Sequence, residues 1–175
     1  PSVSRSIMAI SKIQSESLNL ADTFAFTGTV TGAGEANTPA WFANKTDTTS
    51  ISNTTNTKCT FNVEVLDTDS AFASSTFTVP SGKGGKYYVF GSTQFDSGIN
   101  DGKFNVAFIY INGSIQSKGV FTHGTGGVAI STKVDGIFDL SAGELYCRQN
   151  NGSALNLRGE SGEKTTYFGG YKISS

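Results

Sequence analysis

The clearest sign of the fold class is the stretch Lys86-Tyr87-Tyr88-Val89-Phe90, in which four apolar residues follow one another without a break. Successive side chains of a β-strand point to opposite faces, so such a run predicts a strand that is covered on both sides. Tyr167-Phe168-Gly169-Gly170-Tyr171 has the same character. We expect one face of each strand to pack on the second sheet of a sandwich and the other face to pack on another subunit.

These two runs therefore predict an aromatic interface within an oligomer. Gly169 and Gly170 would permit close approach of backbones there. The alternative is that the rings are ordinary core residues together with a few scattered surface residues. The predicted interface consists of the aromatic residues of the two runs: Tyr87, Tyr88, Phe90, Tyr167, Phe168 and Tyr171.

Short runs with a period of two continue along the chain on either side of these strands. Residues 59–66 alternate, with Phe61, Val63 and Val65 on one face, as in a half-solvated strand. Asn112-Gly113 directly follows an apolar run and predicts a two-residue hairpin turn. Further strands are expected at residues 76–80, 104–111, 128–132, 137–140, 145–148 and 154–157. The pattern predicts an all-β, antiparallel protein of about ten strands.

Length and charge exclude several classes of protein. The 175 residues and 18.4 kDa suit one domain with a short appendage. Lys and Arg number 13 against 14 Asp and Glu, so the net charge is −1, and no basic surface for nucleic acid is expected. No apolar run reaches the roughly 18 residues of a membrane span. The expected partners include neither nucleic acid nor membrane.

Residues 1–36 differ from the remainder and predict an extended N-terminal arm, with the domain proper at residues 37–175. The arm begins Ser-rich and later carries Phe24 and Phe26 interleaved with polar residues. About 35 residues cannot bury a core of their own, so the apolar side chains of the arm need a neighbouring surface. The residues expected to anchor it are Leu18, Leu20, Phe24 and Phe26.

Catalytic, cofactor and metal chemistry finds little support. His123 is the one histidine, and no G-x-S-x-G elbow accompanies it, so a Ser-His-Asp triad is not expected. One His with the distant Cys59 and Cys147 excludes zinc, and two buried free thiols are favoured over a disulfide. Residues 96–102 resemble a calcium loop only weakly, because Ala107 stands where a bidentate Glu belongs.

Five segments together resemble the motifs of the C1q-like family, which shares the jelly roll of tumour necrosis factor. They follow one another in the family's order and cover roughly residues 38–175. One departure is Glu144, where the family usually has aspartate. The segments are Leu66-Asp67 through Phe72, Phe77 to Pro80 with Gly85 to Phe90, Val106 to Gly113, Leu140 to Leu145, and Thr166 to Ile173.

The resemblance implies a ten-stranded jelly-roll sandwich that forms homotrimers around a threefold axis. In that topology the strand at residues 87–90 and the last strand lie in the axial sheet. These are the two runs that are apolar on both faces. The arm, with Leu18 to Phe24 and Phe26 to Gly32, resembles leader segments of phage tail-fibre and capsid-surface proteins.

These observations together predict a non-enzymatic structural protein of a phage particle without cofactors. It would be a trimeric knob on the virion surface, either a capsid decoration (cement) protein or a fibre tip. Its partners would be its own copies and either the major capsid protein or a fibre or tail protein. The alternative is a secreted, extracellular C1q-like recognition module that binds carbohydrate or protein ligands through its apical loops.

Overall fold

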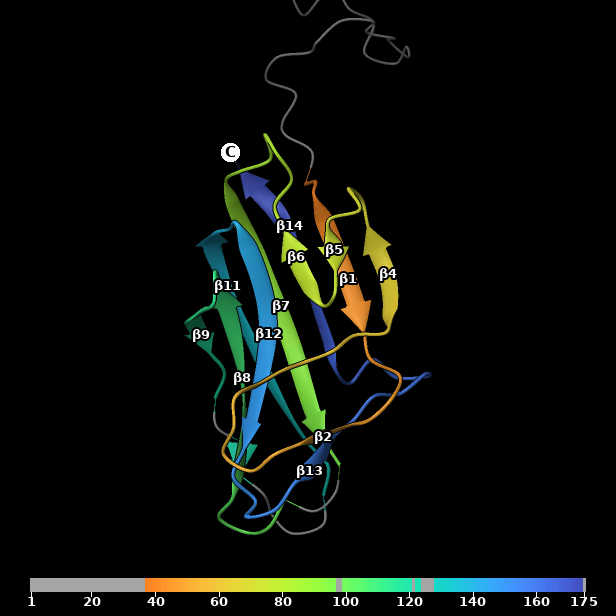
Figure 1. The fold of residues 1–175 in the computed structure, drawn as a ribbon, viewed down its shortest axis with the longest axis vertical. Helices are drawn as coiled ribbons and strands as arrows, with labels where there is room; N and C mark the ends of the chain where they lie inside the picture. The colour runs from red at the N-terminus through yellow and green to blue at the C-terminus, as the bar shows by residue number, and fades with distance from the viewer. Residues whose placement is uncertain (1–36, 97–98, 121, 124–127, 175) are drawn as a thin grey trace, which may run out of the picture. The chain divides into compact units, whose positions relative to one another are not determined.

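The computed structural model describes residues 37–96, 99–120, 122–123 and 128–174 (Figure 1). The predicted arm, with its anchoring residues Leu18, Leu20, Phe24 and Phe26, lies outside the described residues.

One sheet, here called the first sheet, contains the two strands that are apolar on both faces. Its central strands are β7 (Lys86–Phe95) and β14 (Tyr167–Ser174), which pair antiparallel with each other. The strands follow the order β2-β13-β7-β14-β1-β4, and β11 also pairs with β7. The remaining bounds are β1 Ala40–Asn44, β2 Thr49–Ile51, β4 Val63–Asp67, β11 Ile130–Asp139 and β13 Leu155–Leu157.

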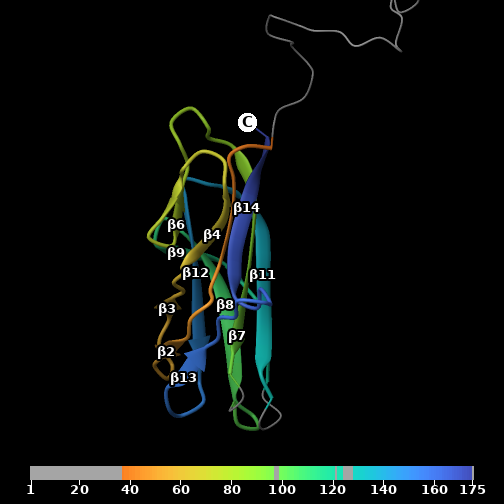
Figure 2. The same ribbon diagram turned by 90° about the vertical axis from the view of Figure 1, so that its right-hand side faces the viewer.

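The second sheet packs against the first, and Figure 2 shows the two layers from the edge. It follows the order β10-β8-β12-β6-β5, with β3 paired to β12 and β9 paired to β8. Its bounds are β3 Thr57–Lys58, β5 Phe72–Ala73, β6 Thr76–Thr78, β8 Phe104–Ile111, β9 Ser114–Lys118, β10 Thr122–His123 and β12 Ala142–Gln149. The prediction of an all-β, antiparallel jelly-roll sandwich is confirmed.

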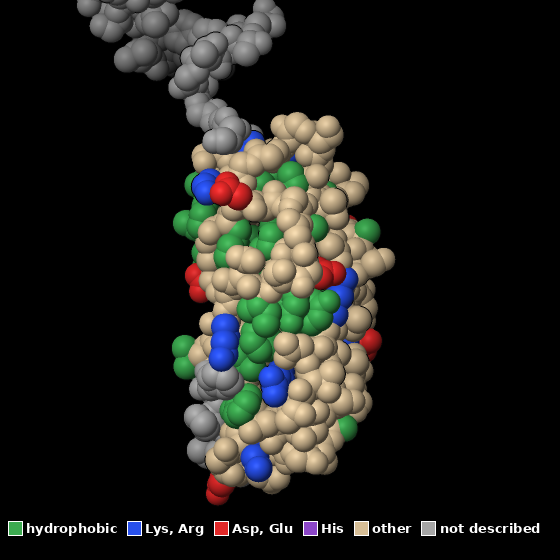
Figure 3. Space-filling model, turned by 60° about the vertical axis from the view of Figure 1, so that its left-hand side comes forward, with side chains coloured by type: hydrophobic (Ala, Val, Ile, Leu, Met, Phe, Trp, Pro, Cys, Tyr) green, Lys and Arg blue, Asp and Glu red, His purple; other side chains and the backbone are tan. Residues whose placement is uncertain are grey.

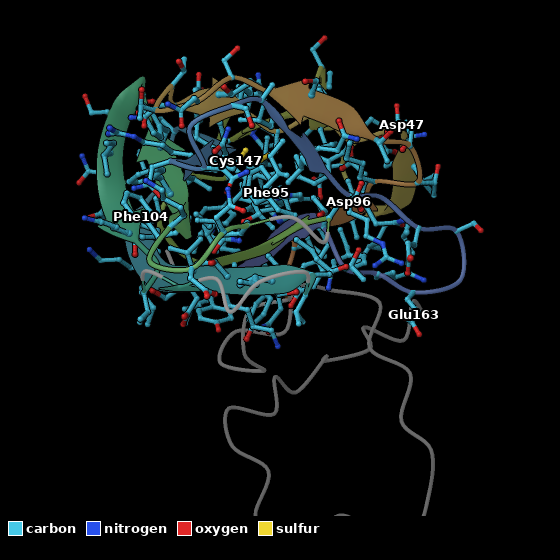
Figure 4. The ribbon with its side chains drawn as sticks, turned by 90° about the horizontal axis from the view of Figure 1, so that it is seen from below. Asp47, Phe95, Asp96, Phe104, Cys147 and Glu163 are labelled. Carbon is cyan, nitrogen blue, oxygen red and sulfur yellow. The ribbon has the colours of Figure 1, made fainter. Side chains whose placement is uncertain are left out.

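The core lies between the sheets and is centred on Trp41, which is 1% exposed. Its ring stacks on Phe77 of the second sheet, with centroids 3.8 Å apart and planes 6° from parallel. Tyr87 and Phe168 of the first sheet also contact Trp41. Figure 4 shows Phe95 and Cys147 pointing into the interior. Large aromatic rings from both layers therefore hold the sandwich together.

Both cysteines are buried and free, as the sequence analysis favoured. Cys59 follows β3 and donates its backbone N–H to the carbonyl oxygen of Leu145, at 2.8 Å. Burial raises the pKa of the Cys59 thiol, and a hydrogen bond with the side chain of Cys147 raises it further. The two residues therefore act as small core residues that join β12 to the segment after β3.

Gly169 and Gly170 leave room for rings of their own chain. A Cβ added to Gly169 would lie 2.9 Å from Cδ2 of Phe42 and 2.9 Å from Cζ of Phe90. One added to Gly170 would lie 2.4 Å from Cη2 of Trp41, inside the core. Side chains of β1 and β7 therefore fill the space above Gly169, and the Trp41 ring fills the space above Gly170.

The predicted two-residue hairpin turn at Asn112-Gly113 is confirmed, since the φ angles of these residues are 52° and 75°. These values match the left-handed pair of a type I′ hairpin turn, which joins β8 to β9. The two short strands expected at residues 128–132 and 137–140 are in fact one strand, β11. It stays continuous because all ten of its residues pair with β7.

The prediction for residues 59–66 is wrong in part. The strand begins only at Val63, and its valines are not buried: Val63 is 37% and Val65 52% exposed. The reason is position, since β4 lies at the end of its sheet and pairs only with β1. Phe61, which precedes the strand, does pack against the core.

The burial of Lys45 could not be expected from the alternation of apolar and polar residues. Lys45 follows β1 and is 0% exposed. Its Nζ donates to Oδ1 of Asp47 at 2.6 Å and to Oγ1 of Thr60 at 3.3 Å. Its backbone N–H donates to Thr166, and its carbonyl oxygen accepts from Glu160. Lys45 thus joins the end of β1 to the segment before β14, and its partners offset the cost of burying the ammonium group.

Candidate functional site

The outer side of the first sheet carries a group of five partly exposed aromatic residues, here called the aromatic face. Strand register places Tyr171 opposite Tyr88, and it places Gly169 between Phe42 and Phe90. Because Gly169 has no side chain, the rings on either side of it can lie over the backbone. The members of the aromatic face are Phe42, Tyr88, Phe90, Tyr167 and Tyr171.

The rings of the aromatic face contact one another in a continuous group. Phe90 is central, with its centroid 6.2 Å from Phe42, 5.7 Å from Tyr88 and 6.2 Å from Tyr167. Tyr88 continues the group to Tyr171, at 5.7 Å. Tyr171 is 37% exposed, and the other four rings are half-buried. A contiguous apolar patch of this kind on a sheet face is typical of an interaction surface.

The predicted interface residues separate into two groups. Tyr88, Phe90, Tyr167 and Tyr171 lie on the aromatic face, where a partner could contact them. The structure places Tyr87 and Phe168 between the sheets instead, each 0% exposed. The alternation of a strand requires this outcome, because residues adjacent in sequence point to opposite sides.

Phe42 belongs to the aromatic face, although the sequence analysis did not select it. It lies in Ala40-Trp41-Phe42-Ala43, a run that is also apolar on both faces of a strand. The run therefore resembled the two from which the interface was predicted. The register of β1 with β14 brings Phe42 opposite Gly169. The run was short, and its relation to the two longer runs follows only from strand order.

Charged groups border the aromatic face along β11. The hydroxyl of Tyr88 donates to Oδ2 of Asp135 at 3.1 Å; partial burial and this hydrogen bond raise the pKa of Tyr88. Lys86 pairs with Asp139 at 2.5 Å. Lys133 and Asp135 line a shallow depression of about 350 Å³ together with Phe90. Positive and negative groups therefore alternate at one margin of an otherwise apolar surface.

The outer side of the second sheet carries another set of aromatic and charged side chains. Figure 3 shows a hydrophobic patch with Lys and Arg side chains near it. Tyr110 of β8 and Tyr146 of β12 stack, with centroids 3.9 Å apart. Glu144 pairs with Lys58 at 2.6 Å. Burial alone would raise the pKa of Glu144, but hydrogen bonds from Lys58 and Thr76 outweigh it and lower the pKa.

The described residues hold no cluster of metal ligands. They contain no group of three or more His, Cys, Asp and Glu side chains that could hold an ion. Within them, no helix has the length and apolarity needed to cross a bilayer. The backbone of His123 lies in β10, but its side chain is outside the described part of the chain, as are residues 97 and 98 of the weak calcium-loop candidate.

Comparison with known proteins identifies the fold. No family model matches the chain, and no curated protein matches it. The globular domain of zebrafish complement 1qA protein is similar in structure, with a TM-score of 0.51 and 14% identity over 78% of this chain and 98% of that chain. The Eiger TNF of S. frugiperda gives 0.52 and 11% over 78% and 92%.

The chain thus has the C1q/TNF-like jelly-roll fold. The resemblance that the five sequence motifs suggested is confirmed at the level of fold. At sequence identities of 14% and 11%, these structural similarities show the fold alone. The function has to be inferred from the surfaces of this chain.

Proposed function

We propose that this chain is a non-enzymatic, homotrimeric knob on the surface of a phage particle, acting as a capsid decoration (cement) protein or as a fibre tip. The observation that carries the proposal is the aromatic face. Five partly exposed rings cover the outer side of one sheet, and three of them surround Phe90. A second and a third copy of the chain are the occupants that we assign to this surface.

Apolar burial would supply most of the free energy of assembly. Covering one exposed Phe side chain completely is worth about 1.5–3 kcal/mol, and each half-buried ring of the three chains would contribute part of that against the cost of association. The charged margin fits copies of the same chain, because Lys133 and Asp135 can pair with opposite charges across a rotated interface. Their position at the margin favours correct orientation more than affinity.

Attachment to the particle would depend on the arm at residues 1–36. Its anchoring residues, Leu18, Leu20, Phe24 and Phe26, are apolar side chains that need a neighbouring surface. The proposed partner is the major capsid protein, or a fibre or tail protein. Three arms on one trimer would bind together, so that weak single contacts give strong attachment.

The alternative from another class is an extracellular recognition module that binds carbohydrate or protein ligands. The stacked Tyr110–Tyr146 pair favours keeping this alternative, because it provides a partly exposed aromatic surface away from the aromatic face. Glycan binding by the isolated protein, together with failure to attach to particles, would support the alternative.

The first prediction concerns the mass of the purified full chain. We expect sedimentation equilibrium at micromolar concentration to give three times the chain mass of 18.4 kDa. The reason is that a single copy would leave the aromatic face in water. A particle of 18.4 kDa, with its tyrosines open to a neutral quencher, would overturn the proposed trimer.

The second prediction concerns the arm. Deletion of residues 1–36 is expected to leave the same three-chain mass but to abolish co-sedimentation with particles stripped of the protein. The control is the full chain with Leu157→Ala, a core substitution on another element that should reduce stability and leave attachment intact. A truncated chain that still decorates particles would contradict the role of the arm.

A further inference from the structure

The outer side of β8 and β12 contains an arginine, Arg148, whose Nε has no hydrogen-bond partner among the described residues. Arg148 is half-buried, and its Nε is buried without a hydrogen bond. Among the described residues, no ion pair of Arg148 occurs. An external ligand cannot reach the buried Nε, so the terminal nitrogens of the guanidinium, which are not buried, are the donors that remain for one.

Strand geometry places Arg148 next to Tyr146, one member of the stacked pair, on β12. On β12 the side chains of Glu144, Tyr146 and Arg148 lie two residues apart, so they project from the same side of the sheet. The half-buried positions of that strand alternate with buried ones, which confirms that this side faces outwards. Tyr146 lies opposite Phe108 of β8, and Arg148 lies opposite Val106.

The tyrosines form a fixed aromatic platform. Tyr110 and Tyr146 stack at 3.9 Å with their planes 23° apart, and Phe108 packs edge-on to Tyr110 at 6.5 Å. The hydroxyl of Tyr110 accepts a hydrogen bond from Nδ2 of Asn56 at 2.9 Å. These contacts hold both rings in place before any ligand arrives, which lowers the entropy cost of binding.

The charges on this surface favour an anionic ligand. Glu144 is already paired with Lys58, which also donates to Oγ1 of Thr76. Lys118 of β9, the strand that pairs with the other edge of β8, lies opposite Phe108. The Glu144 carboxylate is therefore already paired, whereas no carboxylate of the described residues forms an ion pair with Arg148. A guanidinium binds a carboxylate through two parallel hydrogen bonds, a geometry that a lysine cannot reproduce.

We propose that this surface, consisting of Tyr110, Tyr146 and Arg148, binds an acidic saccharide. The carboxylate of a uronic or sialic acid would accept hydrogen bonds from the Arg148 guanidinium. The apolar side of the pyranose ring would lie on the half-buried Tyr146, and the exposed Asn56 amide would be near its hydroxyl groups.

The inference does not depend on the proposed trimer, since the surface belongs to the sheet opposite the aromatic face. The test uses the full chain, with binding of tetragalacturonate and of 3′-sialyllactose measured by calorimetry and by saturation-transfer NMR. Fully methyl-esterified tetragalacturonate is the neutral control, because it keeps the rings and loses the charges. We expect at least one acidic saccharide to bind and the ester to bind at least about tenfold more weakly.

Substitutions then identify the residues involved. Arg148→Met should weaken binding of the acidic saccharide by about tenfold or more, and Tyr146→Leu should remove saturation transfer to the sugar ring. Lys164→Met, which removes one positive charge from an exposed loop position, is the matched control and should change affinity less than twofold. If Arg148→Met does not fold, Arg148→Lys serves in its place, because it keeps the charge and loses the paired hydrogen bonds.

Several outcomes would overturn the inference. They are the absence of binding by both acidic saccharides at millimolar concentration, equal binding of the ester, and unchanged affinity after the Arg148 substitution. The mass of the protein is measured in the same samples. A trimer that binds no saccharide refutes this inference alone, and a monomer that binds one refutes the proposed assembly alone.

Discussion

The substitution Phe90→Glu is expected to convert a three-chain particle into single chains of 18.4 kDa. Phe90 lies at the centre of the aromatic face, in contact with Phe42, Tyr88 and Tyr167. In the proposed trimer a glutamate there would bring three carboxylates close to one apolar axis. Burial of unpaired charges costs several kcal/mol each, which exceeds what the remaining contacts could supply.

The measurement is sedimentation equilibrium of the Phe90→Glu chain, with far-UV circular dichroism to verify that the sandwich is intact. Ile115→Glu is the matched control, because Ile115 is 46% exposed on β9 of the second sheet. The control should keep the three-chain mass. If both variants remain trimeric, the aromatic face is not the surface through which copies associate.

Trp41→Ala is expected to reduce the free energy of unfolding of the sandwich by about 3–5 kcal/mol. Trp41 is 1% exposed and contacts aromatic residues of both sheets, so its loss leaves a large cavity between them. Its indole Nε1 has no hydrogen-bond partner among the described residues, so the loss is one of packing. A domain of ordinary stability, about 5–15 kcal/mol, would unfold in much less denaturant.

Urea unfolding followed by far-UV circular dichroism measures this effect, since the substitution removes the one tryptophan of the chain. The matched control is Phe42→Ala, one position along the same strand but on the outer side. It should cost only about 1–2 kcal/mol and should weaken assembly more than folding. Equal losses for the two variants at the same protein concentration would contradict the assignment of Trp41 to the core and Phe42 to the surface.

Strands that carry a strong local signal were predictable. The two runs around Tyr88 and Phe168 are strands, and both lie in the central part of one sheet. Asn112-Gly113 is a hairpin turn because both residues tolerate positive φ at low cost. In each case the information is contained in a few consecutive residues, so no knowledge of distant parts of the chain was needed.

Other features depended on neighbours far away in sequence. The alternation of Val63 and Val65 correctly indicates a strand, yet both valines are exposed because β4 lies at a sheet end. Lys45 is buried only because Asp47 and Thr60 provide oxygen atoms around its ammonium group. A residue pattern reports which faces of a strand are apolar, but it does not report what lies against them.

The same reasoning applies to the candidate interface. The six aromatic residues were recognisable from the two runs, but Tyr87 and Phe168 are core residues and Phe42 takes their place on the outer side. The Tyr110–Tyr146 stack and Arg148, whose Nε has no hydrogen-bond partner among the described residues, had no signal of their own in the sequence. They come together because β8 and β12, more than thirty residues apart, pair in one particular register.

The order of apolar and polar residues was therefore enough to establish a β-sandwich, its main strands and its C1q/TNF-like motifs, since backbone alternation and turn preferences act over two to four residues. Packing in three dimensions was needed to distinguish core rings from surface rings and to bring Phe42, Tyr88 and Tyr167 around Phe90. The physical reason is that burial and side-chain contact are set by which strands lie next to each other, and that depends on the whole chain at once.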